Sequence, residues 1–71
     1  MIDLSARHPS TQQIMRYFDY DHLPIALQGI SRPCGELAEA MCTVLPDGPE
    51  LTTGLRKLLE AKDCFVRAAL P

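Results

Sequence analysis

The chain has 71 residues, a formal net charge of −2 and 46% hydrophobic residues. A chain of this length buries only about 60% of the surface that it exposes when unfolded, so small domains commonly need disulfides, a metal or a partner. Three cysteines without a CxxC spacing and only two histidines disfavour a disulfide framework and a zinc site, which leaves self-association.

The acidic balance also argues against DNA binding, which needs a basic face. No stretch approaches the roughly 20 apolar residues of a membrane-spanning helix, and the polar N-terminus lacks the pattern of a signal peptide. Together with three free thiols, this predicts a cytoplasmic protein without a membrane partner. We expect one domain over residues 1–71.

The first expected helix covers residues 10–18. The tetrapeptide from Ser10 to Gln13 has the form of a capping box, in which the serine hydroxyl and the glutamine amide each satisfy a free backbone N–H. The tract 19–23 interrupts this helix. Pro24 then suits the first turn of the next helix, where its missing N–H is no loss.

The second expected helix runs from Pro24 to Leu45. Its apolar residues follow one another at alternating spacings of three and four, the rhythm of a coiled-coil seam. Pro33 removes one helical hydrogen bond, so we expect a kink at this proline, used either for a ligand or to curve the helix around an oligomer core. The seam consists of Leu27, Ile30, Cys34, Leu37, Met41 and Val44.

A tight turn over residues 46–49 precedes the third helix, with Asp47 or Gly48 at its cap. So short a link places the two long helices antiparallel. The predicted fold class is therefore all-α: a short N-terminal helix followed by an antiparallel two-helix hairpin that assembles as a homo-oligomer. The apolar face of the third helix contains Leu51, Leu55, Leu58, Leu59, Phe65, Val66 and Ala69.

Lys62 lies in the middle of that apolar face, where a buried ammonium is costly unless an anion meets it. The amine either reaches solvent, pairs with an acid of a neighbouring subunit, or binds a phosphate or carboxylate of a ligand. Arg67 lies on a separate polar face, four residues after Asp63, and can form an ion pair with it.

Further candidates come from the aromatic tract and the proline region. Tyr20 is expected in a loop, where its ring could stack on a nucleobase, whereas Phe18 is expected to pack the short helix onto the hairpin. Arg32 either pairs with Glu36 or contacts a phosphate. No arrangement of catalytic residues and no phosphate-binding glycine loop is found, so we expect neither an enzyme nor a cofactor or metal site.

Two runs of the sequence resemble a known family. They are HLPIALQGISRPCGELAEAM and VLPDGPELTTGLRKLLEAKDCFVRAAL, and similar phage proteins contain the HLP, SRP, LPDGPE and EAKDC–VRAAL motifs in this order. The chain thus resembles the anti-CBASS cyclic-oligonucleotide sponges of bacteriophages, the Acb/Tad hairpin family, over about His22 to Leu70.

The resemblance implies an all-helical homohexamer that sequesters cyclic dinucleotides or trinucleotides without cleaving them. It would block CBASS immune signalling in the cytoplasm of the infected bacterium. The ligand-binding aromatic of the family falls on Tyr20 or Phe18, and its C-terminal arginine falls on Arg67. Ser31 stands where many relatives have a lysine, with Arg32 next to it.

Two other functions are compatible with a small helical hairpin. The chain could be a structural or adaptor hairpin that acts only through oligomerisation, with Lys62 and Arg67 in salt bridges between subunits. A small helix-turn-helix DNA binder is disfavoured by the acidic balance. In the sponge reading, Lys62 is either an interface ion-pair partner or a second phosphate contact.

Overall fold

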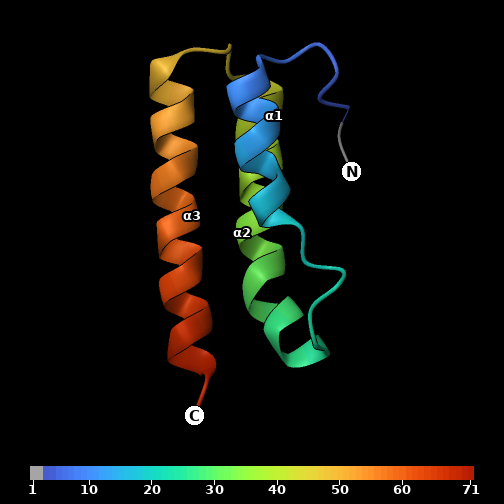
Figure 1. The fold of residues 1–71 in the computed structure, drawn as a ribbon, viewed down its shortest axis with the longest axis vertical. Coiled ribbons are helices and arrows are strands. Elements are labelled where there is room, and N and C mark those ends of the chain that lie inside the picture. Colours follow the sequence, from blue (N-terminus) through green and yellow to red (C-terminus); the bar gives the residue numbers. More distant parts are fainter. Residues whose placement is uncertain (1–2) are drawn as a thin grey trace.

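The computed structural model of the protein describes residues 3–71, and the described part is all-helical without a strand, which confirms the predicted class. Helices α2 and α3 lie side by side and run in opposite directions, and α1 lies in front of α2 in this view (Figure 1). None of the helices in residues 3–71 is long and apolar enough to span a membrane. The elements are α1 (Pro9–Met15), the short 3₁₀ helix η1 (Arg16–Phe18), α2 (Ile25–Val44) and α3 (Pro49–Ala69).

The N-cap of helix α1 is His8, two residues before the Ser10 that the capping box predicts. Pro9 occupies the first helical position, where its fixed φ favours the helix and its missing N–H is no loss. His8 is the N-cap, and its ring Nδ1 accepts a hydrogen bond from the backbone N–H of Ser10 at 3.1 Å. The predicted capping box from Ser10 to Gln13 is therefore wrong, because the proline displaces the helix start.

Helix α2 follows an N-cap at Pro24, whose carbonyl accepts backbone hydrogen bonds from Leu27 and Gln28. The Gln28 side chain also donates to the Leu23 carbonyl at 2.8 Å and holds the preceding loop against the first turn. Helical structure continues through Pro33, and the kink expected there stays a prediction.

The most deeply buried side of α2 lies beside the predicted seam. It is a stripe of small residues, whereas Cys34 and Met41 of the seam are partly buried against the core, and Leu37 and Val44 are 48% and 68% exposed. Small residues are needed because η1 packs closely on α2: a Cβ at Gly35 would lie 2.9 Å from the Phe18 carbonyl oxygen. The buried stripe consists of Ser31, Gly35, Ala38 and Cys42.

The turn between α2 and α3 is fastened to the N-terminal segment through Asp47. Its carboxylate accepts hydrogen bonds from the backbone N–H of His8 at 3.0 Å and the buried Thr11 hydroxyl at 3.1 Å. The guanidinium of Arg7 lies 3.4 Å from the same carboxylate and also donates to the Leu45 carbonyl. Gly48 is the N-cap of α3, so the side chain of Asp47 serves the neighbouring segment rather than its own helix.

Candidate functional site

Lys62 finds its partners within its own chain. Its side chain is buried, and Nζ donates a hydrogen bond at 2.5 Å to the carbonyl oxygen of Tyr17, the central residue of η1. The same nitrogen lies 5.9 Å from the centre of the Phe18 ring and 3.8 Å from the Asp63 carboxylate. A carbonyl, an aromatic face and a nearby carboxylate all stabilise a cation. Lys62 therefore joins α3 to η1 and is not presented to a ligand in this arrangement.

The two candidate aromatic residues have different environments. Phe18 is 3% exposed and belongs to the core, as expected, so its ring is not available for stacking on a base. Tyr20 is partly exposed, and its ring lies over Gly35, within 3.3 Å of the place where a Cβ would be. Tyr20 also lines a small hollow of about 70 Å³ together with acidic residues, which would repel a phosphate placed there: Asp19, Asp21 and Glu39.

Ser31 is fully buried, and its hydroxyl has no hydrogen-bond partner among the described residues. A buried hydroxyl without a partner costs about 1–3 kcal/mol. We find no structural compensation for it. Because its side chain has no exposed surface, Ser31 can reach a ligand only if the packing around this side of α2 opens.

The two candidate arginines lie on the outer surface. Arg32 is 3.6 Å from Glu36, as expected, in a pair so exposed that its contribution to stability is small. Arg67 donates to the Cys64 sulfur at 3.3 Å. The expected pair between Asp63 and Arg67 is not formed, because Asp63 lies beside Lys62 instead. Within residues 3–71, Arg67 is thus a cation without an ion pair.

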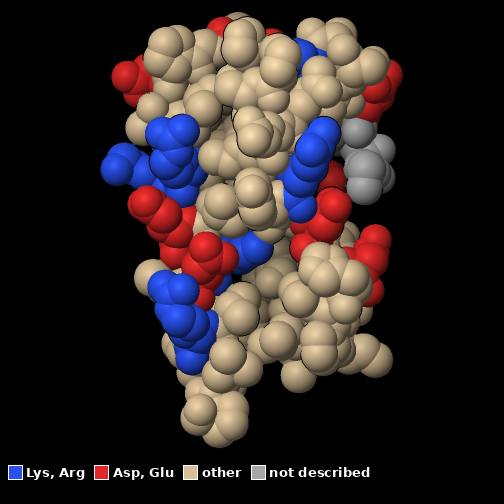
Figure 2. Space-filling view, in the orientation of Figure 1, with Lys and Arg blue, Asp and Glu red and all other residues tan. Residues whose placement is uncertain are grey.

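The structure therefore separates the six predicted site residues into three groups. Phe18 and Lys62 contact each other in the interior, Tyr20 and the buried Ser31 flank the packing around Gly35, and two arginines face solvent: Arg32 and Arg67. Figure 2 shows acidic and basic side chains intermixed along α3 on this face, without a broad basic surface. A single chain offers separated cations rather than a formed anion site.

One feature that the sequence reasoning missed is an apolar groove of about 280 Å³ between α2 and α3. No residue of α1 lines it, because α1 and η1 occupy the other side of the helix pair. The sequence of α3 does indicate such an apolar surface, because apolar or small residues also follow one another there at alternating spacings of three and four. The groove is lined by Leu37, Met41, Leu45, Glu50, Leu51, Gly54, Leu55 and Leu58.

No protein-family model matches the chain, and neither a curated protein nor a solved structure matches it.

Proposed function

We propose that the protein is a non-enzymatic sponge for cyclic oligonucleotides of the kind found among anti-CBASS phage proteins. Copies of the chain assemble, hold a cyclic dinucleotide or trinucleotide between them, and lower the concentration of the signal in the infected host. The ordered motifs from His22 to Leu70 support this function, as does an all-helical chain of matching design.

The proposal rests on Arg67, which combines the position of the family's C-terminal arginine with an exposed side chain that forms no ion pair within residues 3–71. An exposed guanidinium without an ion pair in residues 3–71 is free to bind a phosphate in a bidentate manner. One such cation is a weak site, but symmetry places copies of it around a common axis. A cyclic dinucleotide has two phosphates, so two or three copies of Arg67 match its charge.

The environments of the other candidates assign them different roles. Tyr20 and Arg32 keep exposed surface and remain candidate ligand contacts. Phe18 and Lys62 support the site from inside by fixing the end of η1, from which the chain continues to Tyr20. We therefore replace the direct phosphate contact considered for Lys62 with this supporting role.

Ligand-induced thermal stabilisation tests the proposal. A ligand that binds only the folded state stabilises it by about 2.7 kcal/mol at a hundredfold excess over Kd. We expect the melting temperature to rise with at least one member of a panel of cyclic dinucleotides and trinucleotides. The Arg67→Ala variant should lose most of this rise while keeping the oligomeric state of the wild type.

Arg56→Ala is the matched control, because Arg56 is another exposed arginine on the same side of α3. Its ligand-induced shift should equal that of the wild type. The proposal is wrong if no cyclic oligonucleotide raises the melting temperature, or if both arginine variants respond like the wild type.

The adaptor hairpin remains the second candidate, and the open groove between α2 and α3 favours it. In that case the protein would associate through its apolar surface and bind no nucleotide. Association together with a flat response to the whole nucleotide panel would select this function.

A further inference from the structure

One side of the hairpin carries a continuous uncharged surface, which we call the apolar strip. Three of its large side chains are exposed, Leu37 at 48%, Val44 at 68% and Phe65 at 56%. Ile30, Met41 and Leu58 are partly buried, and Leu51 belongs to the core. Monomeric proteins rarely expose an apolar patch larger than a few hundred Å². On α2 and α3 the strip consists of Ile30, Cys34, Leu37, Met41, Val44, Leu51, Gly54, Leu58, Ala61, Phe65 and Ala68.

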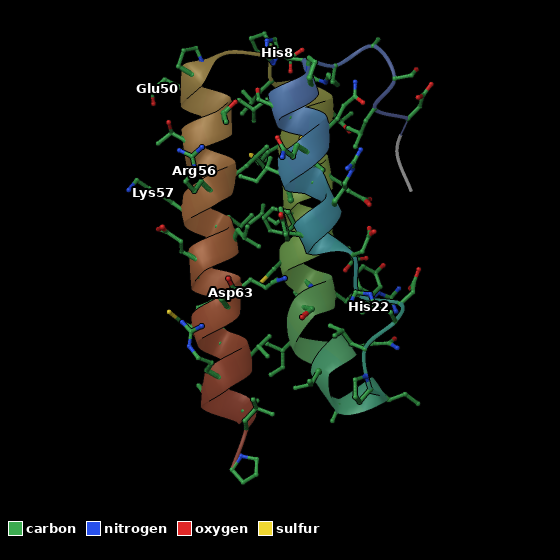
Figure 3. The ribbon with its side chains drawn as sticks, in the orientation of Figure 1. His8, His22, Glu50, Arg56, Lys57 and Asp63 are labelled. Atoms are coloured by element: carbon green, nitrogen blue, oxygen red, sulfur yellow. The ribbon has the colours of Figure 1, made fainter. Side chains whose placement is uncertain are left out.

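Charged residues avoid this strip. At about 100° per residue, those of α2 and α3 project from the other sides of the helices. Only Glu50 and Lys57 lie at its edge, and Figure 3 shows both on the side of α3 that is remote from α2. The exposed or partly exposed charged residues on the other sides are Arg32, Glu36, Glu39, Arg56, Glu60, Asp63 and Arg67, and Lys62 is buried against η1.

The spacing along the strip is that of helix bundles. On α2 the strip residues from Ile30 to Val44, and on α3 those from Leu51 to Ala68, alternate at intervals of three and four. Such seams pack knobs into holes against further helices. Two antiparallel helices whose apolar seams both face the same side correspond to half of a four-helix bundle.

Contacts within one chain do not explain why position 54 is a glycine. It lies inside α3, where glycine costs about 1 kcal/mol relative to alanine. A Cβ at this position would meet nothing within 4 Å. A glycine on a helix surface permits close approach of another backbone, and here no element within residues 3–71 approaches.

We propose that the part of the apolar strip next to the turn is covered by the same surface of a second copy, related by a two-fold axis that passes near Gly54. This part comprises Leu37, Met41, Val44, Leu51, Gly54 and Leu58. The two copies of α3 then overlap over about residues 49–59, and the two hairpins form a short four-helix bundle at this end. Glu50 lies four residues before Gly54 and Lys57 three residues after it. An antiparallel crossing of α3 on α3 at this glycine therefore brings each Glu50 to the partner's Lys57, so the rim charges are complementary only in the two-fold pair.

This inference rests on the self-association that the proposed function requires, and it names the surface. The test therefore uses no nucleotide. Sedimentation velocity of the full chain over a range of concentrations should show a dimer or a multiple of it. If the protein binds nucleotide but does not associate, only this inference is wrong. If it associates but binds no nucleotide, only the proposed function is wrong.

Leu37→Asp places a charge in the strip and should weaken association about tenfold or more. Its matched control is Ile25→Asp, on the same helix and 85% exposed but outside the strip, which should associate like the wild type. Gly54→Leu adds bulk at the crossing, where its own chain has room, and should also weaken association. Circular dichroism checks that each variant is helical.

Charge reversal tests the two-fold arrangement. Glu50→Lys and Lys57→Glu should each weaken association, and the double variant should restore it to within a few-fold of the wild type. A monomeric wild type overturns the proposal. So does undiminished association of both helical Leu37→Asp and Gly54→Leu proteins, or a double reversal that is no stronger than the single ones.

Discussion

Lys62 is stabilised in a buried position because its own chain supplies a carbonyl oxygen 2.5 Å away, the face of Phe18 and the neighbouring carboxylate of Asp63. Charge-assisted hydrogen bonds of this kind are stronger than neutral ones. The carbonyl belongs to Tyr17, the central residue of the short helix η1, which is also held in the core by Phe18. The residue thus couples η1 to α3.

At the same scale, we expect Lys62→Met to destabilise the fold by about 1 kcal/mol. Methionine keeps most of the side-chain volume but leaves the Tyr17 carbonyl without its donor, and a hydrogen bond to a charged group contributes about 1.5–3 kcal/mol. Part of this loss is offset because methionine does not bring a charge into the interior. Urea unfolding measures the difference.

The control is Arg56→Met, which removes an exposed charge from the same helix and should leave the free energy of unfolding within about 0.5 kcal/mol of the wild type. A Lys62→Met protein as stable as the wild type would show that the contact to Tyr17 contributes nothing to the fold.

At the scale of elements, the packing of η1 on α2 depends on side chains being small. Gly35 lies under the Phe18 carbonyl and the Tyr20 ring, and Ala38 and Cys42 continue the same stripe toward the turn. The bulky seam of α2 is turned toward the open groove as a consequence. One helix therefore has two packing sides, a close one inside the chain and a wide one outside it.

We expect Gly35→Ala to destabilise the fold by about 1–3 kcal/mol, because the added methyl group lies 2.9 Å from a backbone oxygen that must move. Gly29→Ala is the matched control in the same helix. A Cβ there meets nothing within 4 Å, so the gain in helix propensity should stabilise the protein by about 0.5–1 kcal/mol. If the melting temperatures of both variants shift in the same direction, this packing is contradicted.

Cys42, which belongs to this stripe, makes the free energy of unfolding depend on pH. Burial raises the pKa of the Cys42 thiol above its ordinary value of 9.0. Above about pH 8.5–9 the thiol of the unfolded chain loses its proton while the folded one retains it, so the free energy of unfolding falls as the pH rises through this range. Below that range the contribution is constant.

The stability difference between wild type and Cys42→Ala, measured by urea unfolding, should therefore shrink between pH 7 and pH 10. Cys64→Ala removes an exposed thiol, and its profile of stability against pH should be parallel to that of the wild type. Parallel profiles for Cys42→Ala and wild type would show that the buried thiol does not cause the change.

Much of this architecture could be predicted from helical periodicity and from the turn around Asp47 and Gly48, within one residue at most helix ends. The buried side of α2 could not, because Ser31 and Gly35 carry no hydrophobic signal and their burial depends on how closely η1 approaches. Lys62 could be identified as anomalous, but its partner lies 45 residues earlier in the chain. Spacing within one helix contains no information about that contact.

At the scale of the whole molecule, a 71-residue chain has a small core on one side of its hairpin and an apolar strip on the other. Its candidate ligand contacts are exposed and separated, with Arg67 and Arg32 on different helices. Both properties lead us to expect that assembly covers apolar surface of the strip and gathers single cations into shared anion sites. We therefore expect function to be a property of the assembly.

Native mass spectrometry with a mixture of cyclic dinucleotides and trinucleotides tests that claim most directly. We predict an assembly of identical chains whose mass increases by whole, uncleaved ligands, with fewer ligands than chains because each site is shared. A chain that stays monomeric, or an assembly that binds none of the nucleotides, would contradict it.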